Sequence, residues 1–176
     1  MAVFFSSDSK ARRECAQARA DGQLALKRTH LHPVLDLRSF LAGRWLILRL
    51  FLDRGEQKSG KFFGTACFAK AGQGLAYREE GQVRYGGYSG IARQYYQYSF
   101  PSAHRAKVHF TDDRLFHDLD LRQGYWQSTH LCDEDCYHGR VQAWSPDRWK
   151  LEWEVLGPRK DLRIATRYIR QCLPTF

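Results

Sequence analysis

The sequence predicts a mainly β protein, an antiparallel up-and-down β-barrel of about 8–10 strands that follows an N-terminal helical extension. In residues 149–155 large apolar side chains alternate with charged ones, and residues 162–168 repeat this pattern after the Gly157-Pro158 pair. A period of two is typical of half-buried antiparallel strands, and a Gly-Pro pair marks a connection. Two strands cannot cover their own apolar face, and the 14% aromatic content favours further strands.

The remaining elements follow from the same alternation and from turn residues. We predict a helix over residues 8–28 within an extension (1–35), and a second, short helix that Asp36 begins and Gly43 ends. The expected strands are residues 45–53, 61–69, 75–84, 91–100, 107–110, 114–121, 125–132, 137–144, 149–155 and 162–168. Short turns join them, so consecutive strands can close into a ring without exposed edges. We therefore expect one barrel domain over residues 36–176.

The composition is that of a folded domain with a basic surface. With 176 residues, 43% of them hydrophobic, the chain can build a full core, and its formal net charge is +9. A positive surface can attract nucleic acid, acidic membranes or acidic proteins. Because the basic residues are spread along the chain, we expect a solvated surface and no nucleic-acid partner. A protein partner could use the nearest approach to a cluster: Arg159, Lys160, Arg163, Arg167 and Arg170, the last three on the outward face of one strand.

The five cysteines are an odd number without the spacing of a disulfide framework, which indicates a reducing compartment. We expect a cytoplasmic protein. An organelle matrix is the alternative, although Asp8, Glu14 and Asp21 count against a transit peptide. The longest apolar run, residues 45–52, contains Arg49 and is too short for a bilayer, so we expect no membrane span. Both faces of this run are apolar, so we expect the strand to be covered on both sides.

Several short motifs together resemble a family of small single-domain proteins of unknown function. They are Phe40-Leu41-Ala42-Gly43-Arg44-Trp45 followed by Arg49, Phe63-Gly64, Tyr77-Arg78-Glu79-Glu80-Gly81, Phe116-His117-Asp118-Leu119, His130-Leu131-Cys132, residues 149–153 and Gly157-Pro158-Arg159-Lys160-Asp161. The resemblance covers residues 36–170 and implies a lipocalin-like (calycin-type) barrel without an established activity. In such barrels a Gly-x-Trp in the first strand and a late-strand arginine close one end, which implies a structural role for Trp45. Cys136 departs from the family pattern.

Alternation also predicts which side chains enter the barrel, because one face of each strand points inward. The predicted interior holds polar side chains among aromatic walls, and these are the candidate ligand-binding residues: Arg49, Tyr77, Glu79, His117 and His130. An apolar cavity with a few convergent polar groups is typical of small-ligand sites. A buried arginine must be paired or must bind an anion, so the expected ligand is partly apolar, with an anionic group as one option. The alternative is an Arg49–Glu79 ion pair that fills the barrel floor and binds nothing.

Other functions remain open on the same barrel. Glu79 and His117 are candidate acid and base residues of an isomerase or hydrolase, although the sequence holds no nucleophile motif or Gly-rich phosphate loop. A non-catalytic subunit of a larger complex is a third possibility. A single histidine, His117 or His130, could hold haem, but the chain has no haem-attachment cysteine pair.

Two imidazoles and two thiols, all zinc ligands in type, lie close together in the sequence: His130, Cys132, Cys136 and His138. A loop of residues 133–135 would place Cys132 opposite Cys136 and bring all four side chains to one face of a hairpin. A loop one residue longer would place Tyr137 opposite Cys132 and separate the set. We favour a hairpin with an acidic turn and no metal.

Overall fold

The structure, a computed structural model, describes residues 30–132 and 134–171. The helix expected over residues 8–28 lies outside the described residues. The described elements are α2 (Leu37–Leu41), β1 (Gly43–Asp53), β2 (Lys58–Ala71), β3 (Gly74–Tyr85), β4 (Tyr88–Ser102), β5 (Arg105–His109), β6 (Leu115–Asp120), β7 (Tyr125–Cys132), β8 (Asp135–Ser145), β9 (Arg148–Gly157) and β10 (Lys160–Arg170). Each strand expected from the alternation is present, with ends that differ by a few residues.

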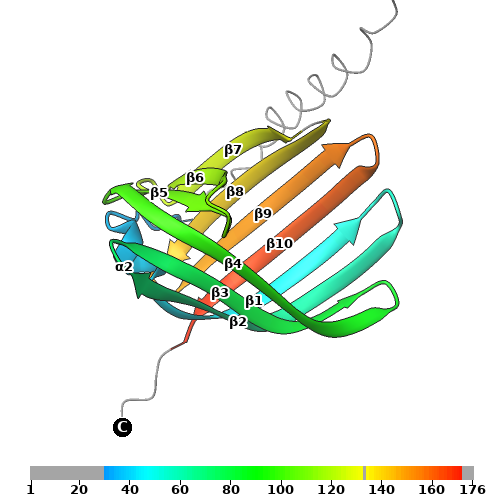
Figure 1. Ribbon diagram of the computed structural model, residues 1–176, viewed down its shortest axis with the longest axis horizontal. Coiled ribbons are helices and arrows are strands. Elements are labelled where there is room, and N and C mark those ends of the chain that lie inside the picture. The colour runs from blue at the N-terminus through cyan, green and yellow to red at the C-terminus, as the bar shows by residue number, and fades with distance from the viewer. Residues whose placement is uncertain (1–29, 133, 172–176) are drawn as a thin grey trace, which may run out of the picture.

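The strands form a single antiparallel sheet that curves into a nearly closed barrel (Figure 1). Its order is β6-β5-β4-β3-β2-β1-β10-β9-β8-β7, so β1 pairs with both β2 and β10 and joins the two halves of the chain. The predicted up-and-down barrel is therefore confirmed, while the more specific likeness to lipocalins stays a prediction. The seam lies between β6 and β7, where the rings of His117 and Trp126 pack with centroids 5.1 Å apart.

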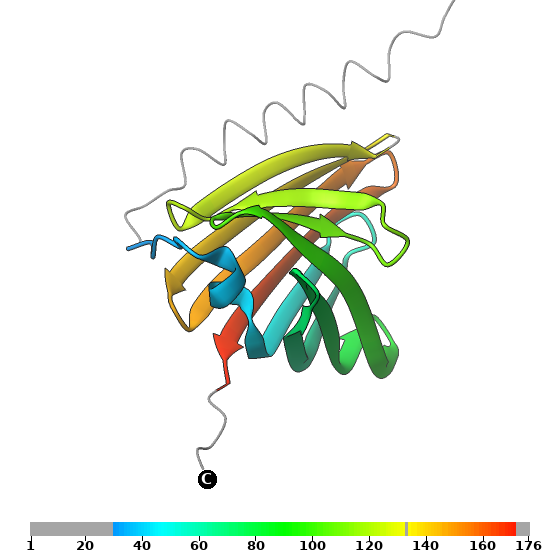
Figure 2. The same cartoon turned by 60° about the vertical axis from the view of Figure 1, so that its left-hand side comes forward.

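Side chains at alternate positions fill the barrel, as the period of two requires. In β1, Trp45 and Ile47 are fully buried, whereas Leu48, Leu50 and Leu52 are 40%, 64% and 44% exposed on the outer face. The expectation that this strand is covered on both sides was therefore wrong. The short helix that precedes β1 packs at one end of the barrel and not on this outer face (Figure 2).

That end of the barrel is closed by α2 together with Trp45. The indole Nε1 of Trp45 donates a hydrogen bond to the carbonyl of Leu41 at 2.8 Å. The Arg170 guanidinium lies 4.2 Å from a Trp45 ring centroid and donates to the carbonyls of Ala42 (2.9 Å) and Phe40 (2.6 Å). These contacts give Trp45 the closing role that the resemblance implied, with Arg170 as the late-strand arginine.

Asp36 begins α2 as its N-cap. Its carboxylate accepts hydrogen bonds from the backbone N–H (3.0 Å) and the hydroxyl (2.7 Å) of Ser39, and these bonds lower the pKa of Asp36. We expect Asp36→Ala to reduce the free energy of unfolding by about 1 kcal/mol in urea titrations, because the first turn loses its acceptor. Asp36→Asn keeps an accepting oxygen and should lose less. Equal losses in the two variants would contradict the capping role.

Candidate functional site

A cavity of about 250 Å³ lies inside the barrel. One part of its wall is a group of hydrogen-bonded polar side chains, here called the polar cluster: Arg49, Tyr77, Glu79, Thr166 and Tyr168. Another part, the aromatic wall, carries flat rings from four strands: Tyr96, Phe116, His117, Tyr137 and Trp153. Aliphatic side chains, among them Leu151 and Ile164, complete the lining. The cavity therefore has the composition expected of a small-ligand site.

The polar cluster is held together by an ion pair between β1 and β3, the two strands on either side of β2. Arg49 binds Glu79 through two parallel hydrogen bonds, Nη1 to Oε1 and Nη2 to Oε2, each 2.6 Å long. Its Nε donates to the hydroxyl of Thr166 at 2.9 Å. Tyr77 donates its hydroxyl proton to Glu79 Oε2 and lies 3.3 Å from the hydroxyl of Tyr168. Every polar side chain of the cluster thus has a partner.

The charges of the polar cluster balance. Burial by itself would lower the pKa of Arg49, but the hydrogen bond with Glu79 and the surrounding charges outweigh it and raise that pKa. Burial raises the pKa of Tyr77 well above its usual value and that of Tyr168 to about 12, so both phenols stay protonated at neutral pH. One cation therefore faces one anion among neutral hydroxyls.

His117 stands apart from the polar cluster, on the aromatic wall. Its ring centroid lies 4.8 Å from that of Phe116, 5.1 Å from Trp126 and 5.3 Å from Trp153. Nδ1 lies 2.8 Å from the backbone carbonyl of Asp118, and since a carbonyl only accepts, Nδ1 carries the proton. Burial lowers the pKa of His117 to about 4, against a smaller opposing effect of the Asp118 carbonyl. The imidazole is therefore neutral at pH 7, with a bare Nε2.

The rings around His117 are stacked in pairs. Phe116 stacks on Tyr96 with centroids 5.6 Å apart and on Trp153 at 5.2 Å. Gln94, Tyr96 and Tyr98 line the same cavity, and within the described residues none of their side chains makes a hydrogen bond. Burial raises the pKa of Tyr96 to about 12. The wall thus combines flat apolar surface with neutral polar groups that are not yet paired.

The structure brings together four of the five ligand-binding candidates that the sequence indicated. Arg49, Tyr77, Glu79 and His117 all line the cavity, as their inward positions predicted. His130 lies near the far end of β7, where its side chain is exposed, and it is not part of the lining. Whether these residues bind a ligand stays a prediction.

Sequence reasoning missed most of the aromatic wall. The alternation over residues 149–155 indicated that Trp153 points inward, whereas no such prediction was made for Tyr96. It did not show which inward rings border empty space and which pack against one another.

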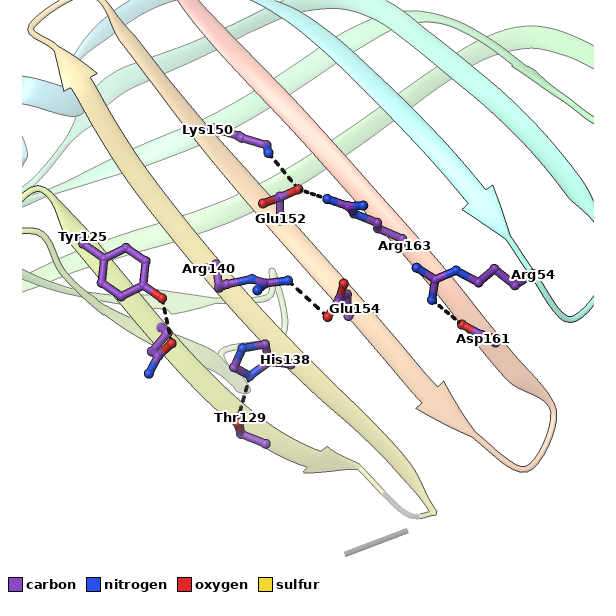
Figure 3. Close-up of polar contacts among 11 residues, drawn as sticks. Arg54, Tyr125, Thr129, His138, Arg140, Lys150, Glu152, Glu154, Asp161 and Arg163 are labelled. Carbon is purple, nitrogen blue, oxygen red and sulfur yellow. Dashed lines mark hydrogen bonds and ion pairs between the residues drawn. The ribbon is translucent and has the colours of Figure 1, made fainter. Parts of the chain in front are cut away.

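The β7–β8 hairpin has neither of the two registers considered for a zinc site. Cys132 pairs with Asp135 and His130 with Tyr137, so only residues 133 and 134 lie between paired positions. This shorter loop shifts the register and places His130 on the face opposite to Cys136 and His138. Cys136 is disulfide-bonded, and His138 Nδ1 lies 3.1 Å from the Thr129 hydroxyl (Figure 3). Over residues 30–132 and 134–171 no three His, Cys, Asp or Glu side chains are grouped as metal ligands.

The outer face of β8, β9 and β10 carries a network of ion pairs (Figure 3). Glu152 binds both Lys150 and Arg163 at 2.7 Å, and Arg140 binds Glu154 at 3.1 Å. Burial raises the pKa of Glu152, but the hydrogen bonds from Lys150 and Arg163 outweigh this and lower it. Part of the positive charge expected on this face is therefore already neutralised.

Arg170 does not belong to the outward stripe that the sequence analysis placed it in. It packs over Trp45 at the closed end of the barrel and also pairs with Asp147 at 3.0 Å. Residue 170 is an odd number of positions from 163 and 167, so alternation puts its side chain on the opposite face. The stripe is reduced to Arg163 and Arg167.

The fold and the cavity together define a β-barrel protein with an internal pocket. The chain belongs to a family of unknown function, DUF6314, whose model matches residues 41–170. This agrees with the resemblance to an uncharacterised family. No curated protein matches the chain significantly.

Several solved structures are similar to this chain. The S-type phycobiliprotein lyase CPES from Guillardia theta is 8% identical with a TM-score of 0.54, over 81% of this chain and 94% of that one. A protein of unknown function from the DUF3598 family of Nostoc punctiforme is 10% identical with a TM-score of 0.47, over 84% and 53%. The barrel EF1p2_mFAP2b bound to DFHBI is 10% identical with a TM-score of 0.43, over 78% and 99%. At these identities the likeness concerns the fold alone. No helix in the described part of the chain is long and apolar enough to cross a membrane.

Proposed function

We propose that the barrel binds a small, largely apolar and uncharged ligand in its cavity. The observation that carries this proposal is a space of about 250 Å³ bordered by aromatic rings and by unpaired neutral polar groups. Ligand sites combine apolar walls with a few orienting polar groups in this way. An apolar cavity of about 150 Å³ is enough for benzene, so this one suits a compound of about two fused rings. It is small for a macrocycle such as haem.

The residues that line the cavity explain why the proposed ligand carries no charge. Arg49 is already matched by Glu79, and His117 is neutral at pH 7 because burial lowers its pKa to about 4. An anionic ligand would lose its hydration without gaining an unpaired cation among the described lining residues, which is costly. The anionic option therefore has less support than an uncharged ligand. The ion pair does not fill the interior either, since the cavity lies beside it.

Binding is better supported than catalysis by the same residues. Both oxygens of Glu79 accept hydrogen bonds from Arg49, and one also accepts the Tyr77 hydroxyl, so this carboxylate is poorly placed to take a substrate proton. His117, with a pKa of about 4, is a weak base at neutral pH. The role of a non-catalytic subunit stays a prediction.

Filling the cavity provides the test. Ile164 lines the cavity from β10, and we expect Ile164→Trp to weaken the binding of naphthalene by more than about tenfold in ligand-observed NMR titrations. The matched control is Arg167→Trp, which adds the same ring to the same strand on the outer face and should leave binding unchanged. Circular dichroism would establish that both variants keep the barrel. Wild-type protein that binds no naphthalene, or an Ile164→Trp variant that binds it equally well, would overturn the proposal.

A further inference from the structure

One residue of the cavity lining, His117, indicates which chemical class of ligand the cavity binds. Resting on the proposed function, we infer that the ligand is a neutral aromatic compound with a phenolic hydroxyl, whose proton is donated to Nε2 of His117. A hydrogen-bond acceptor without a partner is the feature that singles out this class from apolar compounds in general.

The acceptor is identified by the tautomer of His117. Nδ1 is occupied by the Asp118 carbonyl at 2.8 Å, which fixes the proton there and leaves a lone pair on Nε2. Within the described residues His117 has no other hydrogen bond, although its side chain is only 9% exposed and borders the cavity. Nε2 is not one of the fully enclosed unpaired atoms of the described residues, so a small molecule can reach it. A ligand that donates a proton here makes a hydrogen bond that no described protein group provides.

The surroundings of His117 favour a flat ring as the body of the ligand. Phe116 and Trp153 stack at 5.2 Å and Phe116 and Tyr96 at 5.6 Å, and all three residues line the cavity. Aromatic pairs prefer stacked or edge-to-face contacts, which a planar ligand can extend. Aliphatic ligands of the same volume would bury apolar area but would lack these contacts.

The other polar groups in the lining explain why a hydroxyl fits better than a simple N–H. The phenols of Tyr96 and Tyr98 and the amide of Gln94 can donate, and no described side chain accepts from them. A phenolic hydroxyl can donate one hydrogen bond and accept another, so it can donate to His117 and accept from one of these donors at the same time. Glu79 is the more occupied acceptor, since Oε1 already accepts from Arg49 and Oε2 from Arg49 and Tyr77.

Three probes of nearly equal size test the inference: 2-naphthol, 2-methoxynaphthalene and naphthalene. In wild-type protein at neutral pH we expect 2-naphthol to bind about tenfold more tightly than either of the others, which have no proton to donate. In His117→Phe, which keeps a ring between Phe116 and Trp153, this advantage should disappear while naphthalene still binds. His109→Phe, the same substitution on the outer face of β5, should keep the wild-type order of affinities.

A measurement on the unsubstituted protein covers the case in which His117→Phe does not fold. Long-range ¹H–¹⁵N correlation spectra report each imidazole nitrogen, and we expect the His117 Nε2 resonance to move on addition of 2-naphthol and not of naphthalene. Equal affinities for the three probes with an unmoved Nε2 would overturn the inference and leave the cavity as an apolar site. A preference for 2-naphthol that survives in His117→Phe would overturn it too. If no probe binds, the proposed function fails, and this inference with it.

Discussion

Replacing Glu79 with leucine is expected to lower the free energy of unfolding by about 3–5 kcal/mol, because it leaves the Arg49 charge unpaired inside the barrel. The Arg49 and Glu79 side chains are 17% and 4% exposed, so the guanidinium would be left largely buried without its carboxylate. The substitution also removes the acceptor of the Tyr77 hydroxyl. Urea unfolding at neutral pH, followed by tryptophan fluorescence, would measure the loss.

Two further variants make this prediction specific to the buried pair. Arg49→Met combined with Glu79→Leu removes both charges and should recover most of the lost stability, since apolar side chains can replace a buried ion pair at little cost. Glu80 lies on the outer face of the same strand, and Glu80→Leu breaks its exposed contacts with Arg78 of β3 and Arg93 of β4. It should change stability little. A loss in Glu79→Leu no larger than that in Glu80→Leu would mean that water reaches the pair.

The strands and their inward faces could be predicted from the sequence because apolar and charged residues alternate along each strand. In β9 and β10 the pattern of large apolar and charged residues marks both the strands and their buried faces. The same rule placed Arg49 and Glu79 inward on β1 and β3, and both do line the cavity. A period of two depends only on neighbouring residues, so it can be read without knowing which strands pair.

What the sequence did not provide depends on contacts between distant segments. Arg49 and Thr166 are joined by a hydrogen bond across 117 positions, and no local pattern indicates that partner. The free acceptor of His117 depends on a backbone carbonyl whose direction only the folded β6 fixes. The register of the β7–β8 hairpin was missed for a similar reason, because its loop is one residue shorter than the shorter of the two loops considered.

Acid is expected to destabilise the protein through His117. Burial lowers the pKa of His117 to about 4 from the ordinary value of 6.5. Between these two values the unfolded chain binds a proton on this imidazole and the folded protein does not, so the free energy of unfolding rises with pH. Above pH 6.5 both states are neutral and His117 contributes no slope. Because one pKa unit corresponds to about 1.4 kcal/mol, the full loss at low pH is about 3 kcal/mol.

The groups that face His117 set the sign of this effect. The Asp118 carbonyl and carboxylate favour the protonated imidazole, the charge of His130 opposes it, and the packed rings of Phe116, Trp126 and Trp153 carry no charge. Burial outweighs the Asp118 contribution, so protonation remains unfavourable in the folded state.

The stability difference between wild type and His117→Phe isolates this titration, because the carboxylates titrate in both proteins. We expect the wild type to lose more stability than His117→Phe between about pH 7.5 and about pH 4, whereas His109→Phe should follow the wild type. Parallel pH profiles for wild type and His117→Phe would show that the imidazole is hydrated in the folded protein. A proton on Nε2 also removes its lone pair, so affinity for 2-naphthol should fall as the folded protein takes up that proton, near pH 4.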